Sequence, residues 1–424
     1  MRQQFKTKKM KIKIYRGTKE IGGTCIELTA NNGKILWIDL GAPLDVTNPN
    51  IDYVQNKVDA LLISHPHQDH FGLMEMVEPN VPIFIGELSF DLINATKLFR
   101  TMPLLSGNFI KIKPWKKITI ADTFIVTPYL TDHSTPEAFA FLIEADGKRL
   151  FYSGDFRATG RKNIVFSKLI ENPPRNIDLL LMEGTMVERS NHLYPTEDSV
   201  EKAILNIIKS QTNTSFVISS AQNIDRLISV FKACKRSGKY LVIDVYTAWV
   251  LDLLSKQSKN IPAIEWKEIK VFEHPNQLEK ISDNQFNDFL IRISKQKIDN
   301  AVFKNPSDFV YFVRCPNEKL VNTLKSKGKI NIIYSQWEGY LKEEHQTYCT
   351  DYINKLKDDP DYSFQSIHTS GHATVTDLML FAKELNSNKI IPIHTAFPEK
   401  FKEEFEKEGL NNVILWEDNK EYSL

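Results

Sequence analysis

The first part of the chain consists of short hydrophobic runs, most of which end in a polar or charged residue. Their lengths and the turn residues between them predict strands at residues 11–15, 23–28, 34–39, 60–63, 82–85, 124–130, 148–152 and 178–183. Residues 89–99 have helical spacing instead. Strands that come first, with helices added outside them, indicate a β-rich, layered α/β fold.

The pattern changes near residue 195. Strand-like runs at 215–219, 240–245, 309–313 and 330–334 now alternate with helical runs at 196–210, 223–237 and 248–256. Such alternation predicts a second, parallel α/β domain. Residues 260–305 are rich in Lys, Asn and Asp, and we expect them to form a mobile, lid-like excursion from that domain. A further helix is predicted at residues 374–385.

Metal-ligand side chains crowd the end of the predicted strand at 60–63. His65, His67, Asp69 and His70 lie within six residues of one another. Imidazole and carboxylate groups together bind Zn²⁺, and they also suit Mn²⁺ or Fe²⁺. The alternative is a solvated, His-rich loop. Four ligands are too many for one tetrahedral ion that keeps a water molecule, so we expect them to be halves of two adjacent sites.

Similar residues recur at other strand ends. The acids are Asp39, Asp155 and Glu183, and the histidines are His133, His368, His372 and His394. Each acid alone has an ordinary interpretation as a turn, cap or ion-pair residue. Seven of the ten histidines occupy strand-end motifs, however, and a random scatter would not place them there. We therefore expect these loops to meet at one place.

Composition narrows the class of protein only slightly. Hydrophobic residues make up 42% and charged residues 25%, which is ordinary for a soluble globular protein. No stretch approaches the roughly 20 apolar residues of a membrane span. The basic N-terminus has no apolar core of a secretory signal. Four scattered cysteines give no disulfide framework, so we expect a cytoplasmic protein. The net charge of +1 neither requires nor excludes a nucleic-acid partner.

Taken together, the motifs resemble those of the metallo-β-lactamase/β-CASP nucleases, and within that group those of ribonuclease J. The resemblance rests on the HxHxDH stretch at 65–70, His133, Gly154-Asp155, Glu183, His372 and His394. Segments 17–23, 133–136, 153–156, 185–189, 368–373 and 392–394 add to it. It covers most of the chain, and the combination is specific where each single motif is not.

The resemblance implies a four-layer αββα metallo-β-lactamase domain that is interrupted by an inserted α/β β-CASP domain. The first part of the metallo-β-lactamase domain would be residues 1–194, the β-CASP domain 195–345, and the C-terminal part of the first domain 346–424.

It also implies roles for individual residues. His65, His67, His133 and Asp155 would hold one Zn²⁺ ion, and Asp69, His70, Asp155 and His394 the other. Asp69, Glu183 and His372 would be catalytic, while His368 and Ser370 would contact substrate phosphate. In a sheet that resembles the metallo-β-lactamase fold, Asp39 would orient the metal-binding loop from behind. Two features depart from the family pattern: the usual His-Gly-Glu is replaced by His394-Thr395-Ala396, and the sequence ends soon afterwards, without the additional C-terminal domain of ribonuclease J.

These expectations converge on a zinc-dependent ribonuclease that hydrolyses single-stranded RNA, as an exonuclease or an endonuclease, through a hydroxide bridging two metal ions. A nuclease for single-stranded or hairpin DNA is the first alternative. A metallo-hydrolase for small esters would leave Glu183, His372 and the inserted domain without a role. A binding module with a degenerate site would not need the complete ligand set. The sequence leaves open whether the protein forms a homo-oligomer.

Overall fold

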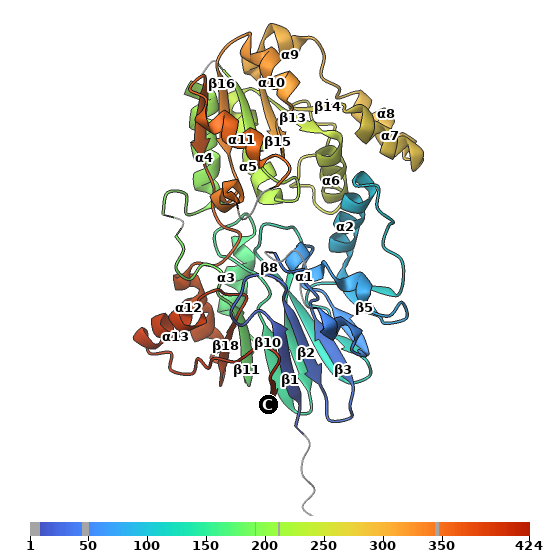
Figure 1. Ribbon diagram of the computed structural model, residues 1–424, viewed down its shortest axis with the longest axis vertical. Coiled ribbons are helices and arrows are strands. Elements are labelled where there is room, and N and C mark those ends of the chain that lie inside the picture. Colours follow the sequence, from blue (N-terminus) through green and yellow to red (C-terminus); the bar gives the residue numbers. More distant parts are fainter. Residues whose placement is uncertain (1–8, 45–50, 191, 211–212, 344–346) are drawn as a thin grey trace, which may run out of the picture.

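The computed structural model describes residues 9–44, 51–190, 192–210, 213–343 and 347–424, so the basic tail at residues 1–8 lies outside the described part. Figure 1 shows two lobes stacked along the long axis. Two sheets form the lower lobe and a third forms the upper one. Within the described ranges, no helix is both long and apolar enough to span a membrane.

The lower lobe is a pair of stacked sheets. The first has the order β19(Glu421–Ser423), β1(Lys11–Arg16), β2(Cys25–Thr29), β3(Ile35–Ile38), β4(Ala60–Leu62), β5(Ile83–Gly86) and β6(Phe109–Ile112). The second has the order β18(Ile390–Ile393), β11(Leu179–Glu183), β10(Lys148–Tyr152), β9(Ala138–Ala145), β8(Phe124–Thr131) and β7(Ile118–Ile120). Both contain a strand from the C-terminal segment, which returns to the lower lobe after the upper one is complete.

Helices cover the outer faces of both sheets. The helices of the lower lobe are α1(Gln68–Phe71), α2(Glu87–Phe99), α3(Asn163–Glu171), α12(Val375–Leu385) and α13(Pro398–Lys407). Alternating side chains of β11 show the arrangement: Leu179 and Leu181 join the core between the sheets, whereas Leu180 packs with Phe381 and Phe401 of the outer helices. This two-residue alternation is what a strand buried on both faces requires. The predicted αββα order is confirmed.

The upper lobe is a parallel sheet with helices on both faces. Its strand order is β14(Ile269–Phe272), β13(Tyr240–Asp244), β15(Phe309–Val313), β12(Thr214–Ile218), β16(Ile330–Tyr334) and β17(Tyr362–Ser366). The helices are α4(Glu197–Ser210), α5(Ile224–Ser237), α6(Val245–Ser255), α7(Pro275–Asp283), α8(Asn287–Ser294), α9(Ala301–Lys304), α10(Glu318–Lys325) and α11(Thr350–Asp358). Parallel strands need such crossover helices, and the helices bury both faces of the sheet.

Strand β17 bears on where the inserted unit ends. It pairs in parallel with β16, and Tyr362 belongs to the same hydrophobic cluster as Ile353 of α11. Both elements follow residue 345, where the sequence placed the boundary. We therefore propose that the inserted unit extends to about residue 366, and that the lower lobe resumes with the loop at 367–374.

The prediction of a mobile excursion at residues 260–305 is wrong. The segment contributes strand β14, which pairs with β13, and helices α7 to α9. Ile281, Phe289 and Ile293 are buried in the core of the upper lobe. The polar composition misled the prediction because these short helices each bury only one narrow face.

A buried ion network joins the two lobes. Glu197, at the start of α4, accepts hydrogen bonds from Arg226 of α5, at 3.0 and 3.2 Å. Arg157 of the lower lobe lies 3.5 Å from the same carboxylate. All three side chains are at most 1% exposed. Burial would raise the pKa of Glu197, but the two guanidinium groups outweigh it and lower the pKa to about 2.

This pKa predicts how stability responds to acid. Glu197 ionises more readily in the folded than in the unfolded protein, so its stabilising effect is complete above its ordinary pKa of 4.5 and is lost as the pH falls toward 2. The difference in unfolding free energy between wild type and Glu197→Gln should shrink by about 1.4 kcal/mol between pH 6.5 and 3.5. Denaturant titrations at both pH values measure it. A difference that stays constant with pH would contradict the ion pairing.

Candidate metal centre

The candidate site lies where several parallel strands end. Strands β8, β10, β11 and β18 run in the same direction, because β9 is antiparallel to both β8 and β10, while β10, β11 and β18 pair in parallel. Their carboxyl ends therefore share one edge of the sheet. The residues delivered there are His133 after β8, Asp155 after β10, Glu183 at the end of β11 and His394 after β18. The loop after β4 reaches the same place from the other sheet.

Tight packing fixes the loop that follows β4. The one-turn helix α1 begins directly after His67 and carries Asp69 and His70. The backbone oxygen of Asp69 accepts a hydrogen bond from Thr24, at 3.1 Å. A Cβ atom on Gly41 would lie only 1.7 Å from that oxygen, so a side chain at position 41 would push the loop away. Glycine there allows the close approach.

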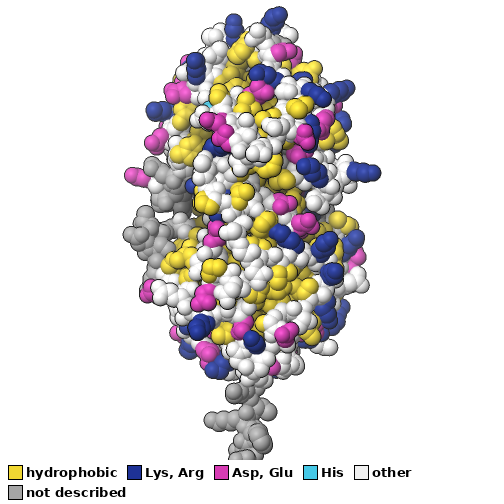
Figure 2. All heavy atoms as spheres, turned by 90° about the vertical axis from the view of Figure 1, so that its right-hand side faces the viewer, with side chains coloured by type: hydrophobic (Ala, Val, Ile, Leu, Met, Phe, Trp, Pro, Cys, Tyr) yellow, Lys and Arg dark blue, Asp and Glu magenta, His cyan; other side chains and the backbone are white. Residues whose placement is uncertain are grey.

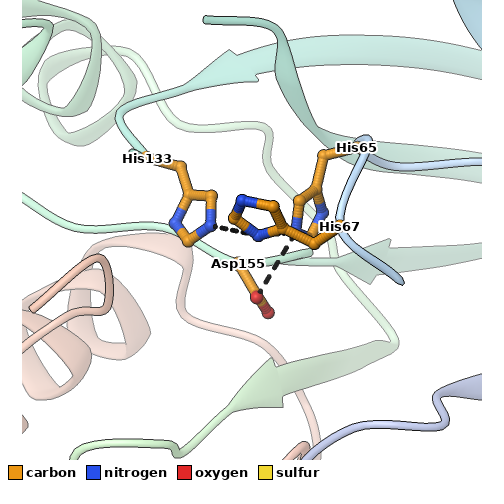
Figure 3. Close-up of side chains that lie close together, drawn as sticks. All are labelled: His65, His67, His133 and Asp155. Atoms are coloured by element: carbon orange, nitrogen blue, oxygen red, sulfur yellow. Dashed lines mark hydrogen bonds and ion pairs between the residues drawn. The ribbon is translucent and has the colours of Figure 1, made fainter. Parts of the chain in front are cut away.

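Three imidazoles and one carboxylate form the first cluster (Figure 3). The ligand atoms of His65, His67, His133 and Asp155 all lie within 4.8 Å of one another. His67 Nδ1 is 3.1 Å from His65 Nε2 and 3.2 Å from His133 Nε2. Asp155 Oδ2 is 3.5 Å from His65 Nε2. The four side chains converge although they come from three separate loops.

The second cluster shares Asp155 with the first. Asp155 Oδ2 lies 3.3 Å from His70 Nε2, and Asp155 Oδ1 lies 3.1 Å from His394 Nδ1. His394 Nε2 donates to Asp69 Oδ2 at 3.2 Å. Asp69, His70 and His394 form one group with ligand atoms within 4.8 Å, and Asp155, Glu183, His372 and His394 form another. One buried carboxylate thus stands between two sets of ligand-type side chains.

The protonation of these rings leaves nitrogen lone pairs that a bound cation would satisfy better than contacts among the rings. His133 Nδ1 donates to the Gly371 carbonyl at 2.6 Å, which leaves its Nε2 unprotonated toward His67. His70 differs: its Nδ1 donates to Asp39 at 2.7 Å, and although burial opposes a charged ring, Asp155 and Asp39 raise the pKa of His70, so that its Nε2 holds a proton toward Asp155 Oδ2, at 3.3 Å. His65 Nε2 and His133 Nε2 both face His67 Nδ1, which carries at most one proton. A divalent cation among them would satisfy the nitrogens and Asp155 together.

The pKa values divide the histidines into two classes. Burial and neighbouring histidines lower the pKa of His65 and of His133, and burial lowers that of His67 to about 4. Burial would also lower the pKa of His394, but Asp155 and Asp69 raise it to about 10. The imidazoles of the first cluster are therefore neutral and ready to donate lone pairs, whereas His394 of the second holds a proton where a metal ion would supply positive charge.

Glu183 and His372 form a pair beside these clusters. His372 Nδ1 donates to Glu183 Oε2 at 3.1 Å. The carboxylate is fixed from behind, because Glu183 Oε1 accepts from the Phe156 amide at 3.1 Å. Glu183 is 1% exposed, whereas His372 is 20% exposed. The imidazole is thus held by a buried acid at one nitrogen and reaches the open side of the site with the other.

The two predicted phosphate contacts lie on the loop before His372. Ser370 Oγ accepts from the His372 amide at 3.1 Å. His368 faces the interior of the interlobe network, where burial and Arg226 lower its pKa to about 3. A phosphate contact through His368 would therefore use a neutral imidazole. The roles of both residues stay predictions.

Some of the supporting residues were not found from the sequence. Asp39, at a positive φ of 57°, accepts from His70, from Ser64 Oγ at 2.8 Å and from Tyr152 Oη at 2.6 Å. The sequence pointed to Asp39, but it did not single out Tyr152, which looked like the last hydrophobic residue of a strand. Thr185 Oγ1 similarly donates to the His394 carbonyl at 3.2 Å.

Two protein-family models match the chain. Residues 37–211 match the β-lactamase superfamily domain, and residues 362–415 match the Zn-dependent metallo-hydrolase RNA specificity domain. The matched segments contain every side chain of the two clusters. They lie on either side of most of the upper lobe.

Relatives align along most of the chain. Ribonuclease J of Mycoplasma genitalium is 24% identical over 92% of this chain and 68% of its own length. Ribonuclease J of Thermus thermophilus is 22% identical over 87% of this chain and 64% of its own length. The chain therefore spans about two thirds of each of these relatives.

A solved structure covers nearly the whole fold. It is a protein of unknown function from Enterococcus faecalis V583, with a TM-score of 0.73 and 19% identity, and the alignment covers 98% of this chain and 100% of that one. At this identity the likeness concerns the fold alone. The two matches show a metallo-β-lactamase domain and the RNA specificity domain of Zn-dependent metallo-hydrolases in this chain, and its relatives named ribonuclease J are 22–24% identical to it over most of its length.

Proposed function

We propose that this protein is a zinc-dependent ribonuclease that hydrolyses phosphodiester bonds of single-stranded RNA. The observation that carries the proposal is the sharing of buried Asp155 by two ligand sets. Homologues named ribonuclease J and the RNA specificity domain favour RNA as the substrate. A small-ester hydrolase would leave the second lobe and the Glu183–His372 pair unexplained.

Two Zn²⁺ ions are the proposed cofactors. His65, His67, His133 and Asp155 would hold one, and Asp69, His70, Asp155 and His394 the other. When bound, such a pair lowers the pKa of a water molecule and offsets negative charge on the phosphate. Both ligand sets combine imidazole nitrogen with the Asp155 carboxylate, and both groups are good zinc ligands.

Residues of the protein itself would protonate the leaving group. His372 Nδ1 is bonded to Glu183, so its Nε2 is the atom that can reach substrate. Burial opposes a charged imidazole here, but Glu183 and Asp155 raise the pKa of His372. A protonated His372 can therefore donate the Nε2 proton to the departing 3′-oxygen. Asp69, which is 15% exposed, stands at the open side of the second cluster.

The substrate strand would lie between the lobes. Figure 2 shows that, on one outer face, the described Lys and Arg side chains are mixed with acidic and hydrophobic ones rather than joined in one basic track. With a net charge of only +1, the chain has no general excess of positive charge to attract a polyanion. RNA affinity would therefore arise near the metal centre.

Replacing one ligand should separate chemistry from folding. His67→Ala should lower the rate of RNA hydrolysis by about a hundred- to a thousandfold, because a group that stabilises transition-state charge is lost. His192→Ala, at an exposed histidine away from the clusters, is the matched control. Rates are measured on a labelled single-stranded RNA, with thermal unfolding followed in parallel. Undiminished hydrolysis by folded His67→Ala would contradict the proposed site.

Matched oligonucleotides should separate RNA from DNA as substrate. RNA should be cleaved about tenfold faster or more than DNA of the same sequence, which corresponds to one hydrogen bond of ~1.4 kcal/mol to the 2′-hydroxyl. Both are supplied as 5′-labelled single strands with equal zinc, and product length is followed with time. Equal or faster cleavage of DNA would replace the proposal with a DNA nuclease.

A further inference from the structure

A loop of the lower lobe is held by three side chains at three consecutive carbonyl groups. Arg226 Nη2 donates to the Thr369 oxygen at 3.4 Å, and Arg157 Nη1 donates to the Ser370 oxygen at 2.7 Å. His133 Nδ1 donates to the Gly371 oxygen at 2.6 Å. His372 follows directly and is bonded to Glu183. The backbone that orients two site histidines is thus fixed by two arginines outside the metal clusters.

Arg157 is itself oriented by the upper lobe. Its Nη2 donates to Asp225 of α5 at 2.5 Å, and Nη1 lies 3.5 Å from Glu197 of α4. Asp132, the neighbour of His133, pairs with Nε at 3.8 Å. The guanidinium is 1% exposed, so in this low-dielectric setting its direction is set by these acids rather than by water. Two of the three acids belong to the inserted unit.

We propose that Arg157 is a positioning residue of the metal centre, through which Asp225 and Glu197 of the inserted unit fix the tautomer and direction of the His133 ring. Arg157 holds Ser370, and Ser370 places the adjoining Gly371 carbonyl. That carbonyl keeps a proton on His133 Nδ1, so the Nε2 lone pair points into the first cluster. The upper lobe therefore completes the metal site as well as covering it. The inference rests on the proposed role of His133 as a metal ligand.

The forked shape of arginine matters to this role. Arg157 donates hydrogen bonds to Asp225 and to the Ser370 carbonyl at the same time, from separate nitrogens. A lysine ammonium keeps the charge but is a single point that cannot reach both in fixed directions. Arg157→Lys therefore preserves net charge while releasing the loop. Asp225→Asn offers a second route, because it weakens the partner that orients the guanidinium while leaving every residue of the lower lobe unchanged.

Arg161 provides the matched control. It lies in the same network, where its amide donates to Asp225 at 3.0 Å and its Nη2 donates to Glu201 at 2.5 Å. None of the described contacts of Arg161 reaches the carbonyls of residues 369–371. Arg161→Lys should lower stability through the shared acids and leave His133 as it is.

The test uses the full chain, with zinc affinity and the His133 ring proton as readouts. Zinc affinity is measured by competition with a chelator, and the His133 Nδ1 proton by NMR of metal-free protein labelled with ¹⁵N-histidine. Arg157→Lys and Asp225→Asn should each lower zinc affinity about ten- to a hundredfold and shift or broaden the His133 signal. Arg161→Lys should change neither, even where its thermal stability falls equally.

Wild-type zinc affinity and an unchanged His133 proton in folded Arg157→Lys or Asp225→Asn would overturn the inference. The same losses in Arg161→Lys would overturn it too, since a general loss of stability would then suffice. Wild-type protein that binds no zinc would instead refute the proposed metal centre. The ring proton, read without metal, would still decide whether Arg157 positions His133.

Discussion

The structure depends on the burial of one carboxylate, Asp155, at the point where loops from both lower sheets converge. A lone buried acid would be strongly destabilising, because its charge is removed from water. Here it is surrounded by His65, His70 and His394 at 3.1 to 3.5 Å. Those rings cannot all be protonated, since burial and mutual repulsion lower the pKa of His65. Against the effect of burial, Asp155 raises the pKa of His70 and of His394, so protons on these two rings supply the positive charge that the proposed cations would replace.

The fold supplies the rigidity that such a centre needs. Parallel strands bring their carboxyl ends to one edge, so residues far apart in sequence meet without long, mobile loops. Supporting contacts then set each ring: Asp39 and Tyr152 behind His70, Glu183 behind His372, and the Gly371 carbonyl behind His133. Groups that contact ligands in this way tune metal affinity as well as orientation. The interlobe arginines extend the same support to a second lobe.

Sequence reasoning predicted the strands and the local motifs better than the long-range contacts. Apolar runs such as 148–152 and 309–313 coincide with β10 and β15, because a buried strand leaves a clear pattern. The metal-type side chains that follow β4, β8, β10 and β18 or end β11 lie together, although their roles as ligands stay predictions. Arg157 left no such pattern. Its hydrogen-bond partners lie 68 and 213 positions away along the chain, and the sequence around Arg157 does not indicate these contacts. Residues 260–305 were wrongly predicted to be mobile, because their polar composition hid the few apolar residues through which α7 and α8 pack against the core.

The positions of bound cations test the proposed metal centre most directly. Crystals of the zinc-loaded protein, with diffraction recorded on both sides of the zinc absorption edge, would locate each ion independently of any activity. If two cations share Asp155, we expect two anomalous peaks about 3.5–4 Å apart on either side of it, one beside His133 and the other beside His394. A zinc ion bound elsewhere, with Asp155 contacting none, would contradict the proposed metal centre.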